Sequence, residues 1–310
     1  MLIEDLQVIL KVAEFRSITG AAESLDMRTA TASAAVKRVE ASLGVELFLR
    51  STRRLRLSAA GERYLPQCEQ ALKMLCTAKQ SMKDELDIVD GELRIAISSD
   101  LGRNMALPWL DEFMEKHPKV SIRVSISDSN IDFYRDSVDV ALRYGSPTDA
   151  SVYGFKICDV PGILCAAPDY LKKHGTPSHP AQLNDYNGLF YQMYGVVYDQ
   201  WEFTKGDEKV KVKMTSNRIS NDADLVRRWC VAGHGFATKS SLDMSADLLA
   251  GRLVNVLPEY QPRSTELWLV CSNKQSITPA VRLLRDTLRI KCSDIFQQMF
   301  KQGILKQPPN

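Results

Sequence analysis

The sequence lacks a hydrophobic run long enough to cross a membrane. Its 310 residues are 45% hydrophobic, but no stretch approaches the roughly 18 consecutive apolar residues that a membrane span needs. Near the start, Glu4, Asp5 and Lys11 interrupt the apolar residues, so this part does not resemble a secretory signal. We therefore expect a cytoplasmic protein that does not enter a membrane.

Catalytic and metal-binding motifs are also missing. The four histidines are scattered, and no H-E-x-x-H, G-x-S-x-G or glycine-rich phosphate loop occurs. The seven cysteines are odd in number and contain no C-x-x-C pair, which favours reduced structural thiols. We expect no enzymatic activity, no cofactor and no metal site. A redox sensor stays an alternative, because Cys158 and Cys165 flank a Pro-Gly turn and could pair.

Positive charge is concentrated in one part of the chain. The formal net charge of the whole sequence is only +2, yet the stretch from Arg28 to Leu57 holds seven Lys or Arg against two acids. A charge run alone is weak evidence of function, because most such runs are solvated surfaces. The secondary structure that the same stretch predicts is more specific evidence of function.

Residues 18–57 are patterned as two short helices followed by a hairpin. Ser17 can cap the first helix, and Gly44 is placed to end the second. Residues 50–57 then form a short alternating stretch with four arginines, which predicts a basic hairpin, or wing. In the second helix, apolar residues at spacings of four, three and four predict a buried face formed by Ala32, Val36, Val39 and Leu43.

This combination indicates binding to a duplex. A helix-turn-helix can place its second helix in the major groove, while flanking cations neutralise phosphates. The alternative is a pair of surface helices with solvated charges. The residues expected to contact DNA are Arg28, Thr29, Thr31, Ser33 and Lys37 on the second helix, and Arg50, Arg53, Arg54 and Arg56 on the wing.

The same residues resemble a known family. The pattern consists of Ala21-Ala22, Leu25, Val36-x-x-Val39-Glu40, Leu43-Gly44-Val45-x-Leu47-Phe48-x-Arg50 and Leu57-Ser58-x-x-Gly61. It resembles the winged helix-turn-helix of LysR-type transcriptional regulators, and the layout agrees over essentially the whole chain. The family commonly opens its recognition helix with Ser-Gln-Pro-Ala-Val-Ser-Arg, but here Thr29 and Ala34 replace the usual Gln and Arg. Typical base contacts therefore cannot be carried over.

A long helix is predicted after the wing. Apolar residues recur at spacings of three and four, a repeat that favours pairing with the same helix of a second subunit. The alternative is a helix packed on its own chain. We expect residues 1–58 to form the DNA-binding domain, 59–90 the dimerisation helix and 91–310 an effector-binding domain. The repeat consists of Leu65, Cys68, Leu72, Leu75, Lys79, Met82, Leu86 and Val89.

After Gly91 the pattern changes to alternating strands and helices over some 200 residues. Such a rhythm predicts an α/β fold with parallel-rich sheets. The family resemblance implies a two-lobed, periplasmic-binding-protein-like effector domain. Its first lobe would span about 91–161 and 269–300, and its second lobe about 162–268.

Loops at the carboxyl ends of strands are where open α/β sheets bind ligands. Hydroxyl and backbone N–H groups there could hold a small polar effector, with carboxylates among the candidates. The same side chains could instead cap helices or fill the core, and Arg103 and Arg143 could be anion counter-charges or surface ion-pair partners. The candidate effector-binding residues are Ser98, Ser99, Leu101, Tyr144, Ser146, Asn221, Asp222 and Phe236.

Together these patterns predict a transcriptional regulator that is a homodimer or a homotetramer. Its expected partners are double-stranded promoter DNA, a small-molecule effector and, as a further candidate, RNA polymerase. A solute-capture module for transport is the alternative from another class, but it would have no use for a basic wing.

Overall fold

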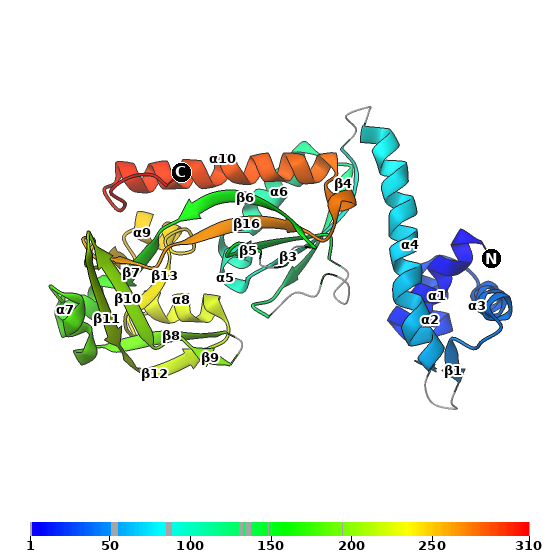
Figure 1. Cartoon of the computed structure of the whole chain (residues 1–310), viewed down its shortest axis with the longest axis horizontal. Helices are drawn as coiled ribbons and strands as arrows, with labels where there is room; N and C mark the ends of the chain where they lie inside the picture. Colours follow the sequence, from blue (N-terminus) through cyan, green and yellow to red (C-terminus); the bar gives the residue numbers. More distant parts are fainter. Residues whose placement is uncertain are drawn as a thin grey trace. The chain divides into compact units, whose positions relative to one another are not determined.

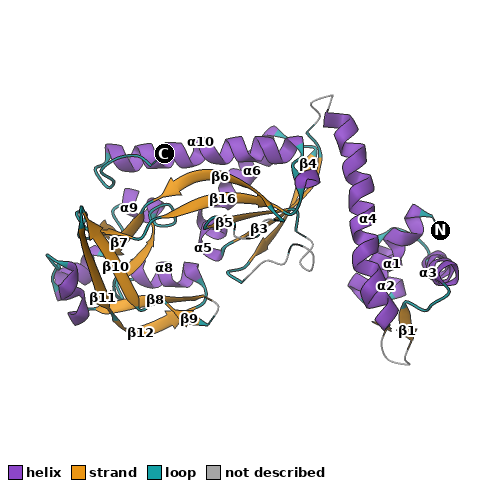
Figure 2. Cartoon of the chain, in the orientation of Figure 1, coloured by secondary structure: helices purple, strands orange, loops and turns teal. Residues whose placement is uncertain are grey.

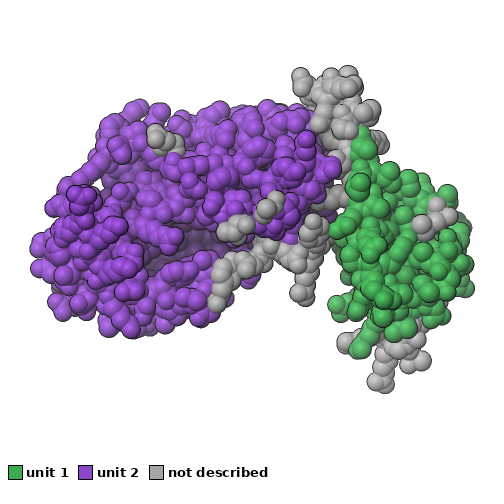
Figure 3. Space-filling model, viewed as in Figure 1, with its two compact units in different colours: residues 1–87 green, residues 88–310 purple. Residues whose placement is uncertain are grey.

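The chain forms two compact units, Met1–Asp87 and Ile88–Asn310 (Figure 3). Each unit has its own hydrophobic core. None of the helices in the described ranges has both the length and the apolar content to cross a membrane. This computed structural model describes residues 2–50, 55–84, 89–129, 133, 138–147, 149, 151–193 and 195–309.

The first unit is a helical bundle with a two-stranded wing (Figure 1). The Ser17 hydroxyl accepts a hydrogen bond from the Gly20 N–H at 3.1 Å and starts the second helix, as expected. Gly44, with φ +70°, ends the third helix in the left-handed conformation that favours glycine. The elements are α1 (Ile3–Phe15), α2 (Ile18–Ser24), α3 (Thr29–Leu43), β1 (Phe48–Arg50), β2 (Leu55–Leu57) and α4 (Ala59–Asp84).

The apolar repeat of α4 divides into two parts. Leu65, Cys68 and Leu72 are buried in the core of their own unit, so for these positions packing within the chain is correct. Met74 and Leu75 are instead 65% and 51% exposed. Exposed apolar side chains are therefore present near the middle of the helix. The side chains of Lys79 and Met82, and the whole of Leu86, lie outside the described residues.

The second unit contains two lobes, and lobe I is built on a five-stranded sheet (Figure 2). The strand order is β4-β3-β5-β16-β6; β3 runs parallel to β4 and β5, while β16 is antiparallel to β5 and β6. A π turn at Gly102–Ala106 joins the first two helices. The elements are β3 (Gly91–Ile97), α5 (Ser99–Leu101), α6 (Leu107–Lys116), β4 (Val120–Ile126), β5 (Val140–Tyr144), β6 (Tyr153–Val160), β16 (Thr265–Cys271) and α10 (Pro279–Lys301).

Lobe II contains three three-stranded sheets, ordered β11-β10-β15, β12-β8-β9 and β13-β7-β14. Among the strands described in this lobe, β12 and β8 are the one parallel pair, so the expectation of parallel-rich sheets is wrong for this lobe. The elements are β7 (Gly162–Ala166), α7 (Pro168–His174), β8 (Asn187–Met193), β9 (Val196–Val197), β10 (Gln200–Lys205), β11 (Glu208–Lys213), β12 (Thr215–Ser220), α8 (Ala223–Val231), β13 (Ala237–Ser240), α9 (Ser245–Leu249), β14 (Val254–Asn255) and β15 (Gln261–Pro262).

The chain crosses between the lobes twice. The first crossing joins β6 to β7 near 161, and the return strand β16 begins at Thr265. The reason is packing, because Leu267 is fully buried in the core of lobe I and must belong to its sheet. Strand β6 was not expected at all, because its exposed and buried residues do not alternate regularly.

Gly61 is the tightest point in the first unit. A Cβ at this position would lie 2.3 Å from the Leu47 carbonyl oxygen, so α4 can pass this backbone only without a side chain. We predict that Gly61→Ala destabilises the unit by about 1–3 kcal/mol through overpacking. Faster amide hydrogen exchange in α1 and α3 would reveal the loss.

Gly20→Ala is the matched control. A Cβ at Gly20 would meet the nearest atom, Phe15 Cβ, at an ordinary 3.4 Å, and alanine favours the helix. Hydrogen exchange in this variant should be unchanged or slower. Equal exchange in the two variants would contradict the packing argument.

Candidate functional site

The third helix presents a polar face to solvent. Arg28, Thr29, Thr31 and Lys37 are exposed, and Ser33 is half-buried. The opposite face is buried, as its spacing predicted. The exposed face is therefore available to bind a partner.

Two acidic side chains fix this helix to its surroundings. Arg38 Nε donates to Asp5 Oδ2 at 3.1 Å, which joins α3 to α1. Asp5 is buried, and its hydrogen bond with Arg38 lowers its pKa against the opposing effect of burial. Glu40 Oε1 accepts hydrogen bonds from the backbone N–H groups of Leu47 at 2.8 Å and Phe48 at 3.2 Å, which joins α3 to the wing. The helix and the wing are thus held in one geometry.

The wing strands pair antiparallel, with Phe48 opposite Leu57 and Arg50 opposite Leu55. Arg56 is exposed on β2. Arg53, Arg54 and the side chain of Arg50 lie outside the described residues.

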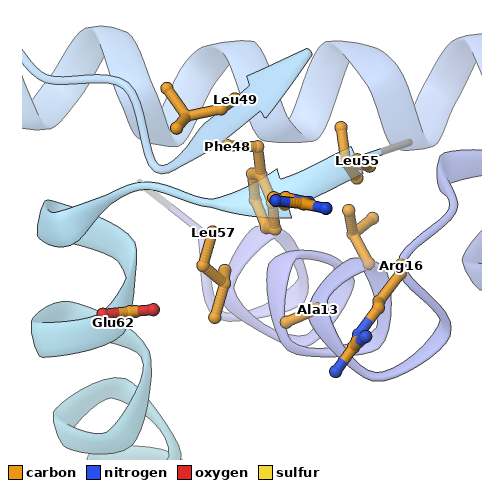
Figure 4. Close-up of a pocket in the computed structure, with 9 residues that line it drawn as sticks. Ala13, Arg16, Phe48, Leu49, Leu55, Leu57 and Glu62 are labelled. Carbon is orange, nitrogen blue, oxygen red and sulfur yellow. The ribbon is translucent and has the colours of Figure 1, made fainter. Parts of the chain in front are cut away.

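A pocket of about 830 Å³ lies between the wing and the helices that carry it (Figure 4). Its wall is mostly apolar, but the guanidinium groups of Arg16 and Arg56 and the carboxylate of Glu62 also border it. Arg16 ends α1 in the left-handed conformation, with φ +50°. Arg16 was not among the residues predicted to bind a partner. Its position in the loop after the first helix is the only feature in the sequence that points to it.

A second cavity, of about 270 Å³, lies between the two lobes of the second unit. We call it the cleft. Pockets of about 500 and 530 Å³ share Met193 with it and therefore lie beside it. The side chains that line the cleft from lobe I are Ser98, Ser127, Asp128, Ser129, Arg143, Tyr144 and Thr265, and those from lobe II are Tyr191, Met193, Ala223, Thr238, Lys239, Ser240 and Asp243.

A buried ammonium group occupies the back of the cleft. Lys239 of lobe II pairs with Asp100 of lobe I and donates to the Ala223 carbonyl at 2.8 Å. The Tyr144 hydroxyl donates to Asp243 Oδ1 at 2.6 Å and accepts from Ser240 Oγ at 2.9 Å. Both carboxylates are buried, and the ion pair between Lys239 and Asp100 joins the lobes through charge.

Burial governs the protonation of this cluster. It raises the pKa of Asp100 from 3.8 to about 7, although the Lys239 charge opposes the shift, and the like charge of Asp243 adds to it. The pKa of Asp243 is raised by its own burial, against Lys239. Burial lowers the pKa of Lys239, but the two carboxylates raise it by more. The cluster therefore keeps its ammonium charge and retains a carboxyl proton up to nearly neutral pH.

Further polar contacts cross between the lobes beside the cleft. Arg103 of lobe I donates to Asp222 Oδ2 at 2.9 Å, which settles its role as an ion-pair partner. Asn104 donates to Asp224 Oδ1 at 2.8 Å. The side chain of Arg143, in contrast, forms no ion pair or hydrogen bond with any residue that the structure describes, although it lines the cleft. It is a cation available to a ligand.

The two units match two families of known domains. Residues 3–62 match the bacterial regulatory helix-turn-helix proteins of the lysR family, and residues 88–293 match the LysR substrate binding domain. The chain belongs to the LysR family of transcriptional regulators. Its predicted family and fold class are confirmed, and the first unit is a helix-turn-helix DNA-binding domain.

Full-length relatives share this organisation with the regulator. The HTH-type transcriptional regulator DmlR of Escherichia coli is 29% identical over 289 residues, which cover 93% of this chain and 94% of DmlR. The full-length virulence activator AphB of Vibrio cholerae is 28% identical, with a TM-score of 0.56 over 93% of this chain and 99% of that one. CrgA of Neisseria meningitidis is 26% identical, with a TM-score of 0.60 over 93% and 98% of the two chains.

The regulator's predicted effector residues divide into three groups. Ser98 and Tyr144 line the cleft, and Ser99, Asn221 and Asp222 line the adjoining 500 Å³ pocket. Ser146 is exposed and borders none of these pockets. Leu101 and Phe236 do not reach the cleft either.

Leu101 and Phe236 are fully buried, each in the core of its own lobe. Phe236 packs edge-on against Tyr170, with ring centroids 5.4 Å apart, and against Tyr186 at 5.2 Å. The large apolar area of each side chain favours the core over a polar loop. The alternative that Phe236 is a core residue agrees with this burial, and Leu101 is a core residue too.

The sequence analysis missed Asp128, Lys239 and Asp243. Asp128 follows the strand β4, and Lys239 lies near the carboxyl end of β13 with Asp243 just after it. The rule that selected Ser98 and Tyr144 applies equally to these positions, so a signal was present. Tyr191 and Met193 lie on β8, a strand that the sequence did not predict.

The redox alternative needs Cys158 and Cys165 to be neighbours, but each of them lies beside a different cysteine. Cys165 Sγ lies 3.9 Å from Cys230 Sγ, and Cys158 contacts Cys292, so Cys158 and Cys165 are not partners. All four are free and buried. Contact with Cys230 and burial raise the pKa of Cys165, which keeps the thiol protonated and poorly reactive.

The buried carboxylates predict how the stability of the second unit depends on pH. Folding raises the pKa of Asp100 to about 7 from 3.8, so between these values the folded state binds more protons than the unfolded state. The contribution of Asp100 to the free energy of unfolding therefore decreases as pH rises from about 4 to about 7. We predict that Asp243→Asn reduces this loss, because it removes the like charge and a second carboxyl with a raised pKa.

The free energy of unfolding at about pH 5 and about pH 7.5 tests this pH dependence. All four tryptophans lie in the second unit, so urea unfolding followed by tryptophan fluorescence reports on that unit alone. Asp111→Asn, on the exposed face of α6, is the charge control. The same pH dependence in wild type and Asp243→Asn would count against an effect of Asp243 on the protonation of Asp100.

Proposed function

We propose that this regulator binds promoter DNA through the exposed face of α3 and the basic wing, under the control of a small carboxylate in the cleft. One observation carries the DNA-binding part of this proposal. The polar face of α3 is exposed while Asp5 and Glu40 fix the helix to α1 and to the wing. A recognition helix needs this combination, because its side chains must meet base edges at defined positions.

The proposed contacts divide by type. Thr29, Thr31, Ser33 and Lys37, with Arg28 at the start of the helix, would meet base edges in the major groove. Wing arginines would bind phosphates, which add affinity and salt dependence but little sequence preference. Arg56 is the exposed wing arginine on the described strands. Arg50, Arg53 and Arg54 are included on their sequence positions alone.

The unpaired Arg143 supports a carboxylate as the effector. A guanidinium group can donate two parallel hydrogen bonds to a carboxylate. Hydroxyl groups of Ser98, Thr238 and Thr265 line the same cleft and offer further hydrogen bonds. The 530 Å³ pocket beside the cleft is lined by Trp201, which suits an apolar ligand body.

Control would follow from closure of the lobes. The ligand would contact both lobes, so it would favour the closure state in which all of these contacts form. Its effect is limited to its difference in affinity between the two states.

We further propose that the regulator is a cytoplasmic homodimer that acts by binding rather than by catalysis. The exposed side chains of Met74 and Leu75 on α4 support pairing of this helix with a second copy. Association of dimers into tetramers and contact with RNA polymerase are extensions of this proposal.

The first prediction of this proposal concerns the wing. Arg56→Ala should weaken binding to all duplexes and reduce the salt slope of log Kd by about 1, since one phosphate contact is lost. Fluorescence anisotropy of labelled duplex from the region upstream of the coding sequence, titrated at several salt concentrations, measures both effects.

Lys213→Ala is the control for the wing variant. It removes one charge from an exposed residue of β11 in the other unit. An Arg56→Ala variant that kept the wild-type salt slope would remove β2 from the interface.

The second prediction concerns the cleft. Arg143→Gln should abolish the tryptophan-fluorescence response to carboxylates that wild type binds, because glutamine cannot replace the charged, two-pronged donor. Acetate, benzoate and succinate form the probe panel. DNA binding without ligand should be retained. Identical carboxylate titrations for the two proteins would exclude Arg143 as the counter-charge.

A further inference from the structure

A carboxylate of the chain itself lies at the junction of the two lobes. Asp128 Oδ1 accepts a hydrogen bond from the Ser99 N–H at 2.7 Å, and its Oδ2 accepts from Ser99 Oγ at 2.5 Å and from the Ala223 N–H at 2.8 Å. Ser99 begins α5 in lobe I, and Ala223 begins α8 in lobe II. We call these three donor groups the cradle.

The cradle is built for a carboxylate. Its donors come from both lobes and are uncharged, and no residue in the described part of the chain forms an ion pair with Asp128. The start of the nine-residue helix α8 adds a partial positive charge. Ser99 is only 3% exposed, so its hydroxyl is committed to this site.

Asp128 also lines both the cleft and the adjoining 500 Å³ pocket, so it lies where a ligand would enter. A carboxylate offers about four acceptor positions, and three here are occupied. Little capacity is left for Asp128 to bind a cationic group of a ligand. Arg143, on the wall of the same cleft, offers the positive charge that the cradle lacks.

We infer that Asp128 is an internal substitute for the effector's carboxylate. The ligand's carboxylate displaces Asp128 and takes over its hydrogen bonds to Ser99 and Ala223, while Arg143 balances the charge. The inference rests on the proposed effector role of the cleft. It adds that ligand and side chain compete, so Asp128 lowers the apparent affinity and sets the ligand concentration at which the regulator responds.

Chemical rescue of a vacated cradle tests this competition. The probe is sodium acetate against sodium chloride at equal ionic strength, with full-length protein and the thermal midpoint of tryptophan fluorescence. Asp128→Ala should unfold at a lower temperature than wild type. Acetate should raise its midpoint at a concentration about tenfold lower than wild type needs, because the competing carboxylate is gone.

Three variants make the result specific. Asp111→Ala removes a negative charge from an exposed residue of α6 and should behave as wild type. Ser99→Ala in the Asp128→Ala background removes a donor and should abolish the acetate effect. If Asp128→Ala does not fold, Asp128→Asn replaces it, because its amide places a donor against the donors of the cradle and should also vacate it.

Two results would overturn the inference. In one, acetate stabilises Asp128→Ala and wild type over the same concentration range, or rescues the double variant equally well. In the other, methylammonium chloride stabilises wild type but not Asp128→Ala, which would make Asp128 a receptor for a cation. Neither readout uses DNA, so their failure is distinguishable from failure of the DNA-binding proposal.

Discussion

The ammonium group of Lys239 pairs with the buried Asp100 of the other lobe, and the arrangement of the lobes depends on this contact. Asp100 belongs to lobe I. Asp243 belongs to lobe II and accepts a hydrogen bond from the Tyr144 hydroxyl of lobe I. A buried charge left without its partner is strongly destabilising. The lobes therefore cannot separate at the back of the cleft without leaving Lys239 or a carboxylate unpaired. The ion pair of Arg103 and Asp222, which also joins the lobes, is more accessible to solvent than this cluster.

The DNA-binding unit also depends on acidic side chains whose partners lie on other elements. Asp5 is a buried acid with one cationic partner, Arg38, and Glu40 satisfies two backbone N–H groups of the wing. Each acid is stable inside the fold only because another element supplies its donors. Helix and wing consequently keep a fixed relation without a large core. Sequence preference can then vary through the exposed residues of α3 while the supporting acids stay unchanged.

Local patterns predicted the first unit well because its signals are short-range. The Ser17 cap, the Gly44 end and the buried face of α3 each depend on residues within a few turns. The second unit was harder, because β6 and β8 are stabilised by strands far away in the sequence. Loop position found Ser98 and Tyr144 in the cleft. It could not show that Leu101 and Phe236 turn into the core, which depends on the packing of whole lobes.

Charge pairing was the least predictable feature. Arg103 and Arg143 look equivalent in the sequence, yet one is ion-paired across the lobes and the other has no partner among the described residues. The difference arises because α8 brings Asp222 to Arg103, and no local pattern encodes that contact. In the proposed site, a ligand would gain from Arg143 because its charge is not already neutralised, whereas at Asp128 it would first have to replace a contact within the chain. Effector affinity in this fold is therefore a difference between external and internal contacts, and the internal ones set the concentration at which the regulator responds.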